Sequence, residues 1–223
     1  MNKKQLLLAI TLAATTLAWG QTSFELPSTY INNNTYGGVN NSLPPNVEGS
    51  PYLPEEFIKG TVFIENEKPY AAMMRYNAYQ DEIQVKSPDG ISSLFKREYV
   101  WAEIGGQSFR IESYNGRSGT SKGYFVELNR GEVRLLKRIE REFKEGQPAV
   151  SSYSEDTPPR FDEKVTYYLI REGSPAEEVR LRKKDVLEFL SSKEMESFVK
   201  ENKLKLKSEN EVIQVLTQIN NAG

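Results

Sequence analysis

Residues 68–87 read KPYAAMMRYNAYQDEIQVKS, and this stretch decides the fold class. Positions 70–79 contain no glycine or proline, and successive side chains there fall alternately on two faces of an extended chain. Tyr76 shares a face with Met74 and Ala78, so both Met74 and Tyr76 are expected to pack inward. The Asp81-Glu82 pair suits a tight turn, and Ile83 and Val85 then recur with a period of two. The stretch therefore predicts two consecutive antiparallel strands.

The same alternation continues on both sides of this stretch and predicts a β domain over residues 52–182. Further strands are expected at Thr61–Ile64, Ile91–Lys96, Tyr99–Ile104, Gln107–Tyr114, Gly123–Leu128, Val133–Phe143, Val165–Arg171 and Glu178–Leu181. Val133–Phe143 also carries apolar residues at helical spacing, but the hairpin turn before it favours a strand. We therefore predict a mainly β protein of the α+β class, whose antiparallel sheet curves into an open half-barrel or a sandwich.

Residues 183–223 differ in pattern from the β domain and predict a C-terminal helical cap. A short helix is expected at the start of this tail. Two capping boxes, Ser191 with Glu194 and Ser208 with Glu211, mark the beginnings of two further segments. Each segment carries one apolar stripe at helical spacing. We expect two or three short amphipathic helices that dock on the sheet, rather than helices that contact a partner or a membrane.

The first twenty residues predict a secretory signal peptide. Lys3 and Lys4 precede an uncharged, mostly apolar run, and Ala18-Trp19-Gly20 offers small residues where a signal peptidase cleaves, before Gln21. The run is shorter than the ~20 residues of a membrane anchor. No later segment approaches the length or apolarity of a membrane span, so none is expected after cleavage. Residues 21–51 are rich in Asn, Ser, Gly and Pro, which predicts a flexible leader. The mature chain is expected to be periplasmic or secreted.

The composition removes several kinds of chemistry. The 223-residue chain has no histidine and no cysteine. It therefore lacks the groups that serve in a Ser-His-Asp triad, as a thiolate nucleophile or as the usual zinc ligands, and we expect no cofactor and no metal. The 29 basic and 31 acidic residues become 27 and 31 without Lys3 and Lys4, a net charge of −4. Nucleic acid is not an expected partner, and a non-enzymatic protein is favoured.

Four side chains are candidates for a binding surface. Arg75 and Tyr79 share one face of the strand predicted over 70–79, and tyrosine with arginine is a frequent combination at interfaces. Trp101 falls opposite a face of small apolar residues, which predicts that it is exposed unless a helix of the tail covers it. Tyr114, at the end of another predicted strand, completes the set. Tyrosine is also enriched in strands because its ring suits a half-buried pleated surface, so ordinary sheet packing is the alternative.

Charged clusters supply two further hypotheses. Acidic pairs occur at Glu55-Glu56, Asp81-Glu82, Asp162-Glu163 and Glu177-Glu178. A glycan hydrolase needs two carboxylates about 5–10 Å apart across a cleft, and adjacency in the sequence does not establish that separation. Residues 130–144 form the densest basic stretch, but glutamates are interleaved with its cations. That mixture is more typical of a solvated, ion-paired face than of a groove for an anionic polymer.

Five segments carry a resemblance to a known family. They read MRYNAYQDEIQVK (74–86), GYFVELNRGEVRLLKR (123–138), TYYLIREG (166–173), KKDVLEFL (183–190) and ESFVKENKLKLKSENEVIQVL (196–216). In these patterns of apolar and turn residues the chain, from Gly60 to Ile219, resembles an uncharacterised family of secreted or cell-envelope proteins of Bacteroidota-type bacteria. The resemblance implies an exported bacterial protein with an antiparallel β core and a helical C-terminus. It implies no activity, ligand or catalytic residue.

These observations together predict an exported, non-enzymatic protein that binds another cell-envelope component, a protein or a glycan, through the concave face or an edge of its sheet. Two alternatives stay open. Carboxylates that converge in a sheet cleft would indicate a glycan-directed hydrolase. A pocket lined only by apolar groups would indicate a carrier of a hydrophobic ligand.

Overall fold

The computed structural model describes residues 26–32, 44, 46–116, 119–149 and 156–222. The predicted signal peptide, residues 1–20, lies outside these ranges. One part of the predicted flexible leader is corrected, because Ser28–Tyr30 form a short 3-10 helix and β1 (Ile31–Asn32) pairs with β5. The Tyr30 hydroxyl donates a hydrogen bond to Glu67, and its carbonyl accepts one from the Phe95 N–H. These bonds fix the segment to the sheet.

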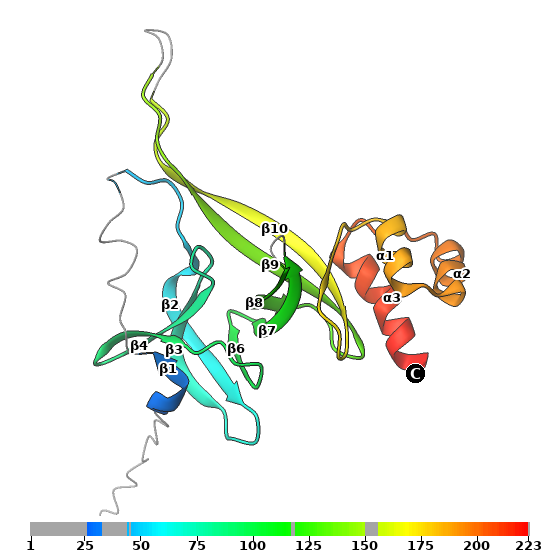
Figure 1. Cartoon of the computed structure of the whole chain (residues 1–223), viewed down its shortest axis with the longest axis horizontal. Helices are drawn as coiled ribbons and strands as arrows, with labels where there is room; N and C mark the ends of the chain where they lie inside the picture. Colours follow the sequence, from blue (N-terminus) through cyan, green and yellow to red (C-terminus); the bar gives the residue numbers. More distant parts are fainter. Residues whose placement is uncertain (1–25, 33–43, 45, 117–118, 150–155, 223) are drawn as a thin grey trace, which may run out of the picture.

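One antiparallel sheet of eleven strands makes up most of the structure (Figure 1). Its order is β1-β5-β4-β3-β2-β6-β7-β8-β9-β10-β11, and it is not closed. After β1 the strands are β2 (Tyr52–Ile64), β3 (Tyr70–Asn77), β4 (Glu82–Ser87), β5 (Gly90–Leu94), β6 (Val100–Ile104), β7 (Gln107–Gly116), β8 (Gly119–Glu127), β9 (Val133–Lys144), β10 (Arg160–Arg171) and β11 (Glu177–Val179). The predicted mainly β class, antiparallel pairing and curvature are confirmed.

The main core lies on one face of β2 to β8. In β3 the side chains of Met74 and Tyr76 are buried, and β4 adds Ile83 and Val85 to the same cluster. The inward orientation predicted for Tyr76 is confirmed. Its ring packs against Phe109 of β7 at a centroid distance of 5.0 Å. The opening stretch of the sequence thus contributes the centre of the core.

The sheet rolls so that the end of β3 meets β9. The Arg141 N–H donates to the Ala78 carbonyl at 3.0 Å. The Asp81 carboxylate lies close to this junction, where three donors converge on it: the Tyr76 hydroxyl (2.8 Å), the Tyr124 N–H (3.1 Å) and the Lys96 ammonium (2.7 Å). One carboxylate therefore links β3, β8 and the loop after β5.

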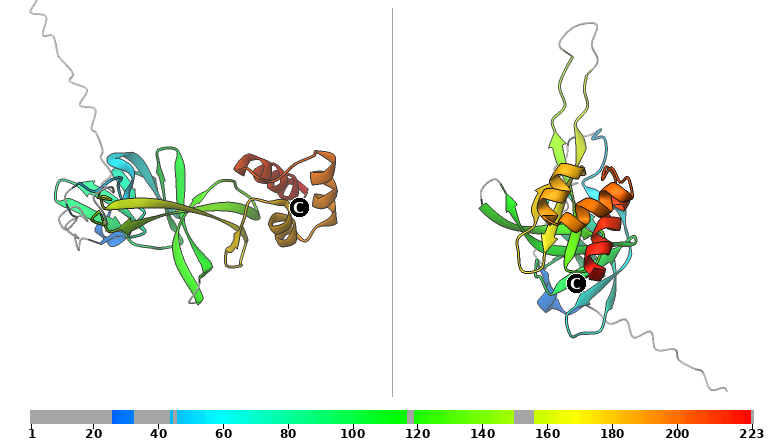
Figure 2. Two further views of the ribbon diagram at one scale, coloured as in Figure 1. Left: turned by 90° about the horizontal axis from the view of Figure 1, so that it is seen from above. Right: turned by 90° about the vertical axis from the view of Figure 1, so that its right-hand side faces the viewer.

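A second, smaller core forms where β7 to β11 wrap around one another. The loop before β11 returns to β7, because the Ala176 N–H donates to the Ser113 carbonyl (2.8 Å) and the Ala176 carbonyl accepts from Asn115 (3.3 Å). The side chains enclosed there are Phe125, Leu136, Tyr168, Ile170 and Ala176, with Tyr114 packed against them. Figure 2 shows the long β9–β10 hairpin running from the rolled strands to the helices.

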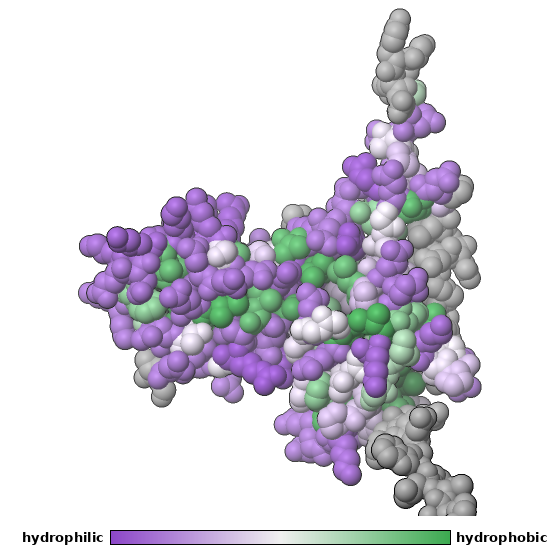
Figure 3. All heavy atoms as spheres, turned by 180° about the vertical axis from the view of Figure 1, so that it is seen from behind, coloured by the Kyte–Doolittle hydropathy of each residue, from purple (hydrophilic) through white to green (hydrophobic). Residues whose placement is uncertain are grey.

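Three helices cap the far end of β9 and β10: α1 (Lys183–Leu190), α2 (Lys193–Glu201) and α3 (Glu209–Ala222). They enclose a third core with Val133, Leu135 and Leu169, which confirms the predicted docking on the sheet. Their outward side chains are mostly hydrophilic when the molecule is seen from behind (Figure 3). No helix within the described ranges is long and apolar enough to span a membrane.

One of the two predicted capping boxes is correct and the other is shifted by a residue. The Glu211 N–H donates to the Ser208 hydroxyl at the start of α3 (3.4 Å). At α2 the acceptor is Ser192 rather than Ser191. Ser191 instead ends α1 in a left-handed conformation (φ 49°), with its N–H bonded to the Leu187 carbonyl. It is therefore not positioned to cap the helix that follows.

The environments of six tyrosines predict a delayed alkaline titration. A hydrogen bond to Glu67 raises the pKa of Tyr30 to about 12, and burial raises the pKa of Tyr167 and of Tyr168 to about 12. The pKa values of Tyr70, Tyr76 and Tyr124 are also raised. A raised folded-state pKa stabilises the fold below the ordinary value of about 10, and this stabilisation is lost as the pH rises through the folded-state value.

We therefore expect six tyrosinates to form above pH ~10 in the folded chain and at about 10 after denaturation, as followed by ultraviolet absorbance. The free energy of unfolding should fall over the same interval. Tyr30→Phe provides a control that removes one late-titrating group from the surface. A folded chain whose titration matches that of the denatured chain would contradict these environments.

Candidate functional site

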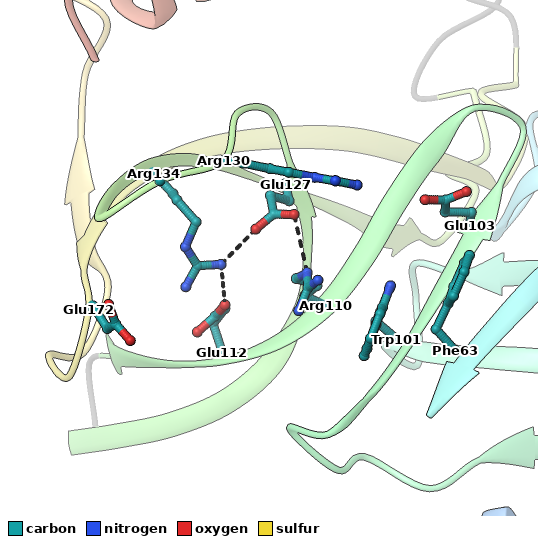
Figure 4. A pocket seen from close by; sticks show the side chains of 10 residues that line it. Phe63, Trp101, Glu103, Arg110, Glu112, Glu127, Arg130, Arg134 and Glu172 are labelled. Carbon is teal, nitrogen blue, oxygen red and sulfur yellow. Dashed lines mark hydrogen bonds and ion pairs between the residues drawn. The ribbon is translucent and has the colours of Figure 1, made fainter. Parts of the chain in front are cut away.

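A charged hollow lies on the face of the sheet opposite the main core. It has a volume of about 580 Å³ and draws its lining from β2, β6, β7, β8, β9 and the turns beside β9 and β10. Seven of its ten lining residues are charged: Glu103, Arg110, Glu112, Glu127, Arg130, Arg134 and Glu172. Phe63 and Trp101 form its aromatic side (Figure 4).

Strand alternation explains why these side chains share one face. In β6, Val100, Ala102 and Ile104 are buried in the main core, so Trp101 and Glu103 point the other way. In β7, burial of Phe109 and Ile111 turns Arg110 and Glu112 outward in the same manner. The predicted orientation of Trp101, away from its apolar neighbours, is confirmed, although the ring is half-buried rather than fully exposed.

The Trp101 ring is held between two neighbours. Phe63 of β2 stacks on one face with a centroid distance of 5.3 Å and an interplanar angle of 5°. The Arg110 guanidinium lies 4.5 Å from the ring centroid. A ligand in the hollow would therefore meet the edge of the indole and the Phe63 ring, since the indole faces are engaged by these two side chains.

A network of ion pairs organises the charged side of the hollow. Arg134 lies 2.7 Å from Glu112 and 2.9 Å from Glu127, and Arg110 lies 3.2 Å from the second oxygen of Glu127. Burial opposes the charge of Arg134, but the hydrogen bonds and charges of the two glutamates raise its pKa above the ordinary value. These four side chains hold one another in place and form the rigid wall of the site.

Three other charged side chains border the hollow without such pairing. Within the described ranges, Glu103, Arg130 and Glu172 form no side-chain ion pair or hydrogen bond. Arg130 extends toward Glu103 across the hollow in Figure 4. These groups keep donors and acceptors available for a bound molecule.

The structure separates the four side chains that the sequence proposed as a binding surface. Only Trp101 lines the hollow. Arg75 is buried, with 8% of its surface exposed, and does not form an open surface with Tyr79. Tyr79 is 48% exposed and contacts Phe161 edge to face. Tyr114 packs in the small core against Phe125, so ordinary packing accounts for its position.

Sequence reasoning missed the charged wall of the hollow. Arg134 lies in the basic stretch that was expected to be a solvated, ion-paired face, and its ion pairs fit that expectation. Its partners Glu112 and Glu127 carried no signal of their own, because they are single glutamates in separate strands. Alternation within each strand could have placed them on the outer face, but not beside one another.

The hollow combines charged and aromatic side chains. Among the described residues no cluster of His, Cys, Asp or Glu could hold a metal ion. Glu112 and Glu127 both bind Arg134, so they do not face each other across an open cleft as a hydrolytic pair would. The hollow offers hydrogen-bonding groups of both signs beside an aromatic edge.

The fold and the site together define a mainly β protein with an open eleven-stranded sheet, a helical cap and a charged, aromatic hollow. No protein-family model, curated protein or solved structure matches the chain. The resemblance to secreted proteins of Bacteroidota-type bacteria therefore stays a prediction.

Proposed function

We propose that the chain is an exported, non-enzymatic binding protein that takes a glycan of the cell envelope into the charged hollow. The observation that carries this proposal is the set of unpaired charges on Glu103, Arg130 and Glu172 beside an organised wall. Such charges can hydrogen-bond the hydroxyl groups of a sugar. Phe63 and the edge of Trp101 supply apolar surface for its C–H groups.

The two alternative functions have less support. A hydrolase would need carboxylates that converge on a substrate, whereas Glu112 and Glu127 are both engaged by Arg134. A carrier of hydrophobic molecules would need an apolar lining, whereas seven of the ten residues around the hollow are charged.

Trp101 provides a direct test of the proposal. The chain has two tryptophans, and Trp19 lies within the predicted signal peptide, so Trp101 is the only one in the mature chain. We expect neutral envelope oligosaccharides to change its fluorescence on binding. Arg130→Ala should weaken that binding about tenfold, because one charged hydrogen-bond donor is lost.

Arg97→Ala is the matched control, since Arg97 is exposed in the loop between β5 and β6 and is not part of the hollow. It should leave the affinity unchanged. If no oligosaccharide alters the fluorescence, or if the two variants weaken binding equally, the proposal is wrong. Export with cleavage of the signal peptide before Gln21 belongs to the same proposal. N-terminal sequencing of the protein recovered from the periplasm and from the medium tests it.

A further inference from the structure

The ion pairs of the sheet leave one group of cations without carboxylate partners. Strands β7 to β10 contain ten Lys or Arg side chains, and each forms an ion pair of 3.5 Å or less. Strands β2 to β4 contain three, Lys59, Arg75 and Lys86, and none of these three has an ion pair within the described part of the chain. All three come from adjacent strands.

The strand register brings these cations to one face. Lys59 lies opposite Met73 on β3, and Met73 lies opposite Lys86 on β4. Directly opposed residues share a face, so the two lysines flank Met73 at a separation of about 10 Å between strands. Arg75 is two residues beyond Met73 and lies on the same face. Met73 is 43% exposed at the centre of the group.

Arg75 is held in a fixed position within this group. Its guanidinium lies 3.3 Å from the centroid of the Tyr52 ring and 4.3 Å from that of Phe57. Its Nε donates to the Gln84 side chain (3.0 Å) and its Nη1 to the Glu55 carbonyl (3.2 Å). Burial lowers the pKa of Arg75, while the charge of Glu56 acts in the opposite direction without forming an ion pair. A buried cation of this kind favours an anion beside it.

We propose that this cationic face, in which the exposed Lys59 and Lys86 flank Met73 and the buried Arg75 adds its charge from beneath, binds the carboxylate groups of an acidic glycan. The choice of a glycan rests on the proposed function, because the face continues from the hollow along β2. Lys59 and Phe63 lie on the same side of that strand, four residues or about 13 Å apart. One extended ligand can reach both.

The position of the cationic face within the sheet favours a glycan over an extended peptide as its ligand. β2, β3 and β4 each pair with a neighbour on both sides, so their main-chain groups are engaged in the ladder. An extended peptide that adds a strand needs an open edge, which this face lacks. Recognition here depends on side chains, with cations for carboxylates and Met73 and Phe57 for sugar C–H surface.

The experiment compares a carboxylated oligosaccharide, an oligogalacturonate, with a neutral maltooligosaccharide of the same length, by calorimetry on the mature chain. Lys59→Gln together with Lys86→Gln should weaken binding of the oligogalacturonate about tenfold or more and leave that of the neutral oligomer unchanged. Binding of the acidic oligomer should also weaken as salt is raised. Both lysines are exposed, so the substitutions spare the core.

Lys122→Gln with Lys144→Gln is the matched control, because it removes the same charge from two lysines whose side chains are 57% and 42% exposed and already ion-paired. It should leave both affinities unchanged. Equal losses in the two double variants would overturn the cationic face as a site and show a general charge effect. Binding of phosphatidylglycerol vesicles, but not of the oligogalacturonate, through Lys59 and Lys86 would overturn the glycan as its ligand.

The hollow is tested separately by Arg130→Ala. If that variant weakens binding of the neutral oligomer while the Lys59 and Lys86 double variant leaves the acidic one unaffected, the proposed function stands and the cationic face is wrong. If neither oligomer binds the wild-type chain, both are wrong.

Discussion

Asp81→Ala is expected to lower the free energy of unfolding by about 3 kcal/mol. The Asp81 side chain is only 17% exposed and accepts hydrogen bonds from Tyr76 and Tyr124 while it is ion-paired to Lys96. Alanine would leave the Tyr124 N–H without this acceptor, and the Tyr76 hydroxyl with only the more distant Ile139 carbonyl (3.4 Å), at nearly inaccessible positions. Each unsatisfied buried group costs about 1–3 kcal/mol. Chemical denaturation followed by circular dichroism measures the loss.

Asp81→Asn separates the hydrogen bonds from the charge. Asp81 has a positive φ of 56°, which asparagine also tolerates, and the amide oxygen can still accept from Tyr76 and Tyr124. We expect this variant to lose only about 1 kcal/mol, from the ion pair with Lys96. Asp89→Ala, in the exposed turn between β4 and β5, should change stability by less than about 0.5 kcal/mol. If Asp81→Ala and Asp89→Ala unfold alike, Asp81 does not hold the rolled sheet together.

The sequence predicts burial correctly where it depends only on the alternation of side chains within one strand. Alternation in β3 correctly placed Met74 and Tyr76 in the core. Val133–Phe143 was ambiguous, and the structure shows why: β9 is covered on both faces. Leu135 packs under the helices, whereas Leu136 belongs to the small core. A strand buried on both sides has apolar residues at odd and even positions, which imitates helical spacing.

Alternation within β3 could not predict the burial of Arg75. The pattern placed it on the polar face of β3, which is correct, but predicted nothing about what covers that face. The register between β2 and β3 shifts between Leu53 and Ile58. Tyr52, just before this irregularity, and Phe57, within it, place their rings against the guanidinium. Burial of Arg75 therefore depends on a bulge in a neighbouring strand, which the residues of β3 do not encode.

The hollow required contacts that no local pattern reports. Arg134 and Glu112 are 22 positions apart and meet because β7, β8 and β9 are consecutive in the sheet and twist together. The same applies to Ala78 and Arg141, which join only because the sheet rolls. Sequence patterns predict which face a side chain takes, whereas the curvature of the sheet decides which side chains meet.

Asn220→Ala is expected to lower the free energy of unfolding by about 2 kcal/mol and to loosen the helical cap. The Asn220 side chain of α3 accepts from the Val133 N–H (2.9 Å) and donates to the Val133 carbonyl (2.9 Å). It thereby takes the place of a neighbouring strand at the beginning of β9. Val133 is 1% exposed, so alanine would leave its N–H without this acceptor in a dry environment, while its carbonyl would keep only the hydrogen bond from the Asn129 side chain (3.0 Å).

The readout that identifies this role is amide hydrogen exchange. The cap has its own apolar core, separate from that of β2 to β8, so faster exchange should be confined to α1, α2, α3 and the start of β9. Asn220→Asp keeps the acceptor for Val133 but loses the donor, and it brings a negative charge to the Val133 carbonyl, so it should cost at least as much as alanine. Asn221→Ala, the exposed neighbour, should change stability by less than about 0.5 kcal/mol. If all three variants exchange like the wild type, the helices are held by apolar packing alone and Asn220 contributes nothing to their docking.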